Sequence, residues 1–132
     1  MSLPCHCLQL RKATRKIGAR YDAALAPAGI NIAQYSLLRT VERHQPISLT
    51  DLGRSLELDR STMGRNVRVV EKLGLVELGR GQDQREATVS LSERGSEALR
   101  AAEPLWARCQ DEIAKRLGAE RLGMLAELKT LL

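Results

Sequence analysis

The hydrophobic pattern of this chain changes from a helical period to a strand period, and back again, around residues 75–91. Residues 75–78 and 87–91 alternate in the manner of β-strands. The polar segment 79–85 between them contains two glycines, which is typical of a hairpin tip. On either side, apolar residues recur at the three- and four-residue steps of helices. We therefore predict a mainly helical α+β fold with one two-stranded hairpin.

Helix-breaking and capping residues divide the rest of the chain. A first helix is expected over about residues 8–26, ended by Pro27 and Gly29. Good N-cap residues begin four further helices: Asn31, Ser48, Asp59 and Ser92. Pro104 lies inside the last helical run, where the apolar pattern continues in phase, so we expect a kink and not an end.

The core of this fold must be aliphatic, because the chain has no Phe, two Tyr and one Trp. A formal net charge of +5 favours an anionic partner. No apolar run approaches the roughly 20 residues that span a bilayer, and the first residues lack a secretory pattern. Three cysteines do not make a disulfide framework. We therefore expect a cytoplasmic protein.

The helices that begin after Ser48 and Asp59 are joined by a tight turn, as in a helix-turn-helix. The second helix should bury the side that carries Met63, Val67 and Val70. The opposite side carries four polar residues: Ser61, Arg65, Arg68 and Lys72. Arginines suit base edges and phosphates, while hydroxyl and first-turn N–H groups suit phosphate oxygens. This side is therefore a candidate DNA-binding surface; a solvated basic face is the alternative.

The hairpin that follows adds Arg80 and Arg85 near its tip. A helix-turn-helix with such a hairpin is a winged helix, whose wing can place an arginine in the minor groove. Asp83 is expected to hold the Arg85 guanidinium in a fixed pose, unless the two form only a surface ion pair. A winged helix that binds a protein and not DNA remains a second reading.

Four short motifs occur in a specific order and spacing: Leu-Asp-Arg-Ser-Thr-Met at 58–63, Glu-Lys-Leu-Gly-Leu-Val at 71–76, Asp-Gln-Arg at 83–85 and Val-Ser-Leu-Ser-Glu-Arg-Gly at 89–95. Together they resemble the multiple-antibiotic-resistance regulator (MarR) family, over nearly the whole chain. The resemblance implies a homodimeric winged-helix repressor of a pseudo-palindromic operator, released by a small-molecule effector. Residues 1–30 and 92–132 would form a helical dimerisation region, and residues 31–91 the DNA-binding region.

The helical side, the wing and this resemblance together give the predicted DNA-binding residues: Ser48, Arg60, Ser61, Thr62, Arg65, Arg68, Lys72, Arg80, Asp83 and Arg85. One position departs from the family. Members often have a hydroxyl residue where this chain has Gly64, which offers no side-chain contact.

Apolar residues in the last helical run follow a spacing close to a heptad seam. A monomer that exposed this seam would carry a large apolar patch, so we expect a homodimer. The seam would otherwise pack only against the chain's own first helix. The predicted interface residues are Leu10, Ile17, Leu99, Trp106, Ile113, Leu117, Leu122 and Leu125.

The cysteines suggest a redox alternative. Organic-hydroperoxide-resistance regulators, which belong to this family, sense oxidant with a cysteine at the start of the first helix, and Cys7 matches that position. Two tyrosines hydrogen-bond that sulfur in those regulators; Tyr21 corresponds to one, whereas Arg11 replaces the other and would stabilise a thiolate. Cys109 falls near the resolving thiol that the other subunit supplies. Buried structural cysteines are the alternative.

Otherwise, the resemblance implies a small aromatic or anionic effector between the two regions, with Arg11, Arg15 and Tyr21 as candidate lining. No metal is expected at residues 5–7, because a structural site needs about four ligands and the chain has three Cys and two His. We expect no cofactor and no enzymatic activity, because the chain lacks a phosphate loop, a nucleophile elbow, a zinc-protease helix and a dinucleotide glycine pattern.

Overall fold

The structure, a computed structural model, describes residues 3–82 and 85–132. Its elements, in chain order, are α1 (His6–Leu25), the 3₁₀ turn η1 (Ala26–Ala28), α2 (Ile32–His44), β1 (Ile47–Ser48), α3 (Leu49–Leu56), α4 (Arg60–Lys72), β2 (Val76–Arg80), β3 (Ala87–Leu91) and α5 (Glu93–Leu131). The mainly helical α+β class is confirmed.

Side-chain caps begin four of these helices. Asn31, Ser48, Asp59 and Ser92 each accept a hydrogen bond from a backbone N–H in the first turn of α2, α3, α4 and α5. All four predicted caps are confirmed. α5 runs through Pro104, and the non-helical backbone of Gly118 (φ 82°, ψ 161°) divides it into two helical segments.

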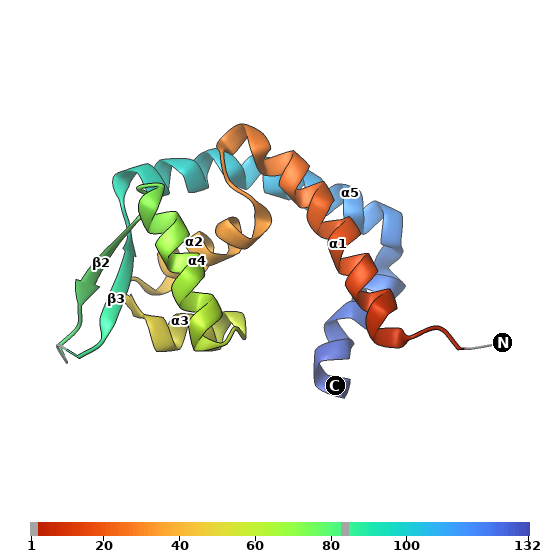
Figure 1. The fold of residues 1–132 in the computed structure, drawn as a ribbon. Helices are drawn as coiled ribbons and strands as arrows, with labels where there is room; N and C mark the ends of the chain where they lie inside the picture. Colours follow the sequence, from red (N-terminus) through yellow and green to blue (C-terminus); the bar gives the residue numbers. More distant parts are fainter. Residues whose placement is uncertain (1–2, 83–84) are drawn as a thin grey trace.

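The elements lie in two groups, joined by α5 (Figure 1). At one end, α2, α3 and α4 gather with the sheet. At the other end, α1 lies along the later part of α5, close to both chain termini. α5 is therefore the common support for both groups.

The sheet has three antiparallel strands in the order β1-β3-β2, one more than predicted. The missed strand, β1, has only two residues, so it is too short to show a period-two pattern. It pairs Ile47 with Val89 and Ser48 with Thr88, and the buried Ile47 joins the core. The short strand thus joins the middle of β3 to the start of α3.

The core is aliphatic, as predicted, and lies mainly in the first group. Tyr35 of α2 stacks on Trp106 of α5, with ring centroids 5.6 Å apart. Leu99 is only 2% exposed and belongs to the same core. The prediction of Leu99 as a dimer-interface residue is therefore wrong, because its own protomer already covers it. Trp106 is half-buried in that stack.

The start of α5 is packed tightly against the turn between α4 and β2. The Ser92 hydroxyl donates to the Gly74 carbonyl oxygen (2.6 Å) and accepts from the Gly95 N–H (3.0 Å). Gly74 has φ 77°, in the left-handed region, and terminates α4. These contacts hold the hairpin, α4 and α5 in one arrangement.

Candidate functional site

The turn between α3 and α4 closes over a glycine. Glu57 adopts a left-handed conformation (φ 53°), and the Leu58 N–H donates to the Gly53 carbonyl oxygen (2.9 Å). A Cβ at Gly53 would lie 3.1 Å from the Leu58 carbonyl oxygen. The absence of a side chain there lets the turn close and brings Asp59 to the start of α4.

α4 has one buried face and one exposed polar face. Met63, Val67 and Val70 are 1%, 2% and 0% exposed. The opposite face carries exposed residues: Ser61, Arg65, Arg68 and Lys72. The predicted division of this helix into two faces is therefore confirmed. Arg60, at the first helical position, is also exposed.

The first turn of α4 is occupied by the carboxylate of Asp59. Its Oδ1 accepts hydrogen bonds from the Thr62 backbone N–H (2.8 Å) and from the Ser61 hydroxyl (2.9 Å). The backbone bond from Thr62, then the hydroxyl bonds from Ser61 and Thr62, lower the pKa of Asp59. Two of the donors that we expected to suit phosphate oxygens, the Ser61 hydroxyl and the Thr62 N–H, are therefore bonded to Asp59 in this structure.

The same carboxylate reaches further along the helix through Thr62. The Thr62 hydroxyl donates to Asp59 Oδ2 (3.0 Å), and Arg65 Nη2 donates to the Thr62 hydroxyl oxygen (3.3 Å). From the sequence, Asp59 is predicted only as a helix cap. The signal that could have revealed more was the i, i+3, i+6 spacing of a carboxylate, a hydroxyl and a guanidinium.

The wing is formed by β2 and β3. Arg80 ends β2 and pairs in register with Ala87, and both Arg80 and Arg85 are exposed. The Gly81 N–H donates to the Glu86 carbonyl oxygen (3.3 Å) near the tip. Asp83, which we expected to hold Arg85, lies outside the described residues. The two described wing arginines thus lie near the tip of the hairpin that follows α4: Arg80 at the end of β2, and Arg85 just before β3.

Ser48 lies at the N-terminus of α3, beside a polar recess. Its hydroxyl oxygen accepts from the Asp51 N–H (3.0 Å), and Asp51 pairs with Arg54 (3.1 Å). The recess has a volume of about 380 Å³ and is lined by His44, Pro46, Ile47, Ser48, Asp51, Arg54 and Ser55. Ser48 is therefore the N-cap of α3, and it also lines this polar recess.

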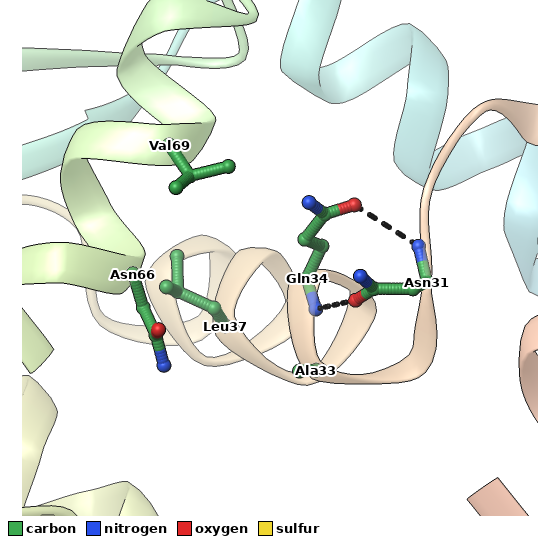
Figure 2. Close-up of a pocket in the computed structure, with 6 residues that line it drawn as sticks. All are labelled: Asn31, Ala33, Gln34, Leu37, Asn66 and Val69. Carbon is green, nitrogen blue, oxygen red and sulfur yellow. Dashed lines mark hydrogen bonds between the residues drawn. The ribbon is translucent and has the colours of Figure 1, made fainter. Parts of the chain in front are cut away.

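A second pocket, smaller than the recess beside Ser48, lies between α2 and α4 (Figure 2). It was not predicted. Figure 2 shows Asn31 and Gln34 joined by two reciprocal hydrogen bonds, on the side of the pocket facing Val69 and Asn66 of α4. The two bonds measure 3.0 and 2.9 Å. The pocket's volume of about 180 Å³ is below the roughly 300 Å³ of ordinary ligand sites. The side-chain oxygens of Asn31 and Gln34, on its α2 side, each already accept from the other residue's backbone N–H in a capping box.

An apolar groove runs between α1 and the later part of α5. It has a volume of about 360 Å³ and is lined by Leu10, Ala13, Thr14, Lys16, Ile17, Arg20, Ile113, Arg116, Leu117 and Leu125. Five residues predicted for the dimer interface lie here: Leu10, Ile17, Ile113, Leu117 and Leu125. Leu10 and Leu125 remain 46% and 47% exposed. The groove thus offers apolar surface that the chain does not itself cover.

Tyr21 lies beside α5, near Cys109. The Tyr21 hydroxyl donates to Gln110 Oε1. Burial and then the nearby Cys109 raise the pKa of Tyr21, and burial followed by Glu112 raises the pKa of the buried Cys109 thiol. Cys109 therefore has the surroundings of a structural cysteine.

The other predicted switch residues lie apart from this pair. Cys7 is exposed in the first turn of α1, 14 residues before Tyr21, which is about 21 Å along a helix. Arg11 and Arg15 are exposed on the same helix. Arg15 and Tyr21 differ by roughly 120° around α1. One protomer therefore brings neither Cys7 to Cys109 nor the three predicted effector residues to one place.

Two features of the described residues bear on other classes of site. Within 3–82 and 85–132, no group of three or more His, Cys, Asp or Glu side chains could hold a metal ion. In the same part of the chain, none of the helices combines the length and the apolar character needed to cross a membrane.

Comparison with known proteins gives consistent relatives. A family profile described as the MarR family matches residues 28–86. An uncharacterized HTH-type transcriptional regulator of Bacillus subtilis (strain 168) is 25% identical over 121 residues, which cover 91% of this chain and 72% of that protein. The organic hydroperoxide resistance transcriptional regulator of the same organism is 28% identical over 91 residues, which cover 68% of this chain and 62% of that protein.

Among solved structures, the M. tuberculosis transcriptional regulator MosR in complex with DNA resembles this fold with a TM-score of 0.81. It is 32% identical to this chain, and the match covers 95% of this chain and 98% of that one. The likeness therefore includes both groups of elements and α5 between them.

Proposed function

Because this chain belongs to the MarR family of winged-helix transcriptional regulators, we propose that it binds double-stranded DNA as a homodimer. α4 would enter the major groove, and the β2–β3 wing would lie at the adjacent minor groove. Bound in this way to a pseudo-palindromic operator, the dimer represses transcription until a small aromatic or anionic effector releases it.

The observation that carries the proposal is the exposed polar face of α4. Three cations and a hydroxyl follow one side of a helix whose other side is held in the core. Such a rigidly supported cationic helix can contact phosphates and base edges at once. The MosR structure, a relative at 32% identity, is a complex with DNA and supports the same use of this fold.

Selection of bound sites from random duplex DNA, followed by affinity measurements over a range of salt, tests this proposal. We expect a two-part site whose affinity falls steeply with salt, because phosphate contacts release counterions. Arg68→Ala should weaken binding and lower the salt slope, whereas Arg108→Ala, an equal charge change on an exposed residue of α5, should not. If no duplex is selected and no salt-dependent DNA binding is found, the protein-binding winged helix is favoured instead.

The apolar groove between α1 and α5 supports the homodimer. A second copy related by twofold symmetry would present the same groove, so that Leu10 and Leu125 of each copy could be covered together. The effector site would then be completed by the partner, because one protomer separates Arg11 and Arg15 from Tyr21.

A peroxide-sensing repressor is a second candidate, favoured by one observation. Cys7 is exposed in the first turn of α1, and a relative at 28% identity is the organic hydroperoxide resistance regulator. Since α1 separates Cys7 from Cys109 within a protomer, a disulfide between them would have to join two subunits. Oxidation of Cys7 would then strain the dimer and change the spacing of the two α4 helices.

Treatment with stoichiometric organic hydroperoxide distinguishes the two candidates. A redox switch predicts loss of DNA binding and a dithiothreitol-reversible covalent dimer, both abolished by Cys7→Ser. If Cys7 remains a thiol by mass spectrometry and DNA binding persists, the small-molecule candidate stands.

A further inference from the structure

The carboxylate of Asp59 lies within the polar surface that the proposed function assigns to DNA. It accepts three hydrogen bonds from two residues of the first turn: from the Thr62 N–H (2.8 Å), the Ser61 hydroxyl (2.9 Å) and the Thr62 hydroxyl (3.0 Å). Both carboxylate oxygens are used, Oδ1 for the first two donors and Oδ2 for the third.

These contacts fix the direction of the protons. An ionised carboxylate only accepts hydrogen bonds, and a hydroxyl has a single proton to give. The proton of the Thr62 hydroxyl therefore points at Asp59, which leaves its oxygen to accept from another group. Arg65 Nη2 is that donor, at 3.3 Å.

Asp59 and Arg65 are six residues apart, so they lie on different sides of the helix and cannot pair as i, i+4 residues do. Thr62 lies three residues from each of them and bridges the two. The resulting series Asp59–Thr62–Arg65 connects the cap of α4 to a guanidinium of its exposed polar face.

A negative charge at this place works against DNA binding, because it repels phosphates. Serine or asparagine would cap the helix about equally well without that charge. The carboxylate is distinguished from them by its two acceptor oxygens, one for the helix and one for the Thr62 hydroxyl.

We propose that Asp59 is a positioning residue, which acts through the Thr62 hydroxyl to hold the Arg65 guanidinium in the pose that reads a base edge. The inference rests on the proposed function and deepens it. An arginine held in place before binding loses less rotamer freedom on contact with a base, and it favours one base position over its neighbours.

Four single variants separate positioning from capping and from charge. Asp59→Asn keeps an N-cap oxygen but lacks the second acceptor. Thr62→Val removes the hydroxyl, and Thr62→Ser retains it. Asp111→Asn, at an exposed carboxylate on α5, matches the charge change of Asp59→Asn away from the winged helix.

Each purified protein is tested by selection from random duplex DNA and by affinity for single-base variants of the wild-type site at constant salt. We expect Asp59→Asn and Thr62→Val to lose roughly fivefold of discrimination, the lower end for one side chain–base pairing. The loss should fall at the base position that Arg65→Ala also relaxes. Thr62→Ser and Asp111→Asn should keep the wild-type preference, and Asp59→Asn combined with Arg65→Ala should lose no more than Arg65→Ala alone.

The inference is overturned if Asp59→Asn and Thr62→Val keep the wild-type preference, or if they relax a base position that Arg65→Ala does not. If Asp59→Asn fails to fold, the base preference of Thr62→Val alone tests the inference. A wild-type protein that selects no sequence overturns the proposed function, and this inference with it.

Discussion

Gly95 of α5 lies directly against the carbonyl oxygen of Leu75: a Cβ at residue 95 would be 1.9 Å from that oxygen. Neither atom can yield easily, because the carbonyl belongs to the backbone and also accepts from the Ser92 N–H (3.1 Å). The junction between α4, the wing and α5 therefore admits only glycine at this position.

Gly95→Ala should consequently destabilise the protein by about 3 kcal/mol or more, the upper range for overpacking. Chemical denaturation followed by circular dichroism measures the change. Gly123→Ala is the matched control, because its Cβ meets nothing within 4 Å in the last helical segment, and it should stabilise by about 0.5–1 kcal/mol. Equal effects of the two changes would contradict the close contact.

Asp59 should give the stability of the fold a specific dependence on pH. Its hydrogen bonds lower the pKa of the folded state below the unfolded value, which is about 3.9 for Asp. The stabilisation is therefore complete above that pH and is lost as the pH falls through the lower folded value. The difference in Tm between wild type and Asp59→Ala should be largest near neutral pH and should narrow below about pH 4; a constant difference would show that the charge is not involved.

The three cysteines should differ in reactivity. Burial raises the pKa of the Cys109 thiol and covers its sulfur, whereas Cys5 and Cys7 are exposed. Alkylation by iodoacetamide at pH 8 should therefore modify Cys5 and Cys7 about tenfold faster or more than Cys109, because the thiolate is the reactive form. Peptide mass spectrometry over time measures the rates, and the same reaction in urea, where all three sites are exposed, is the control. Similar rates in the folded protein would argue against a buried Cys109.

Leu10 tests the groove as a dimer interface. At 46% exposed, it contributes little to the core of its own protomer, so Leu10→Glu should leave the fold intact. The change should weaken self-association about tenfold or more, as loss of a central apolar contact does. Sedimentation velocity over a concentration series measures the effect. Leu78→Glu, at a similarly exposed leucine of β2 (41%), should leave association unchanged.

The caps of the helices were predictable because cap chemistry is local. Asn31 and Ser92 each act on backbone groups within three residues, so the sequence contains both partners. The same holds for the buried and exposed faces of α4, which follow from helical spacing alone.

What covers an apolar face was not predictable from spacing. The stripe along α5 is continuous in sequence, but its early part, with Leu99, meets the core beside α2, and its later part, with Ile113, meets α1. Periodicity indicates which side of a helix is apolar and not which neighbour packs against it. Leu99 was assigned to the wrong partner for this reason.

The hydrogen bonds that join Asp59, Thr62 and Arg65 were also not predictable, because they depend on three-dimensional positions. The residue types at 59, 62 and 65 predict a cap and a cation, but the direction of a hydroxyl proton depends on the three-dimensional position of its acceptor. β1 was missed because two residues cannot show alternation, although Gln45, just before it, accepts from the Leu91 N–H (2.8 Å) and helps to fix the pairing.

Because α5 contacts both α1 and the winged-helix elements, a tilt at one end of this helix is transmitted to the other end. From Glu93 to the break at Gly118, the helix spans about 38 Å at 1.5 Å per residue. A tilt of about 5° at the α1 end would therefore displace the wing end by roughly 3 Å, close to the rise of one base pair along DNA. A tilt of this size would therefore be enough to change the position of α4 relative to the operator proposed above.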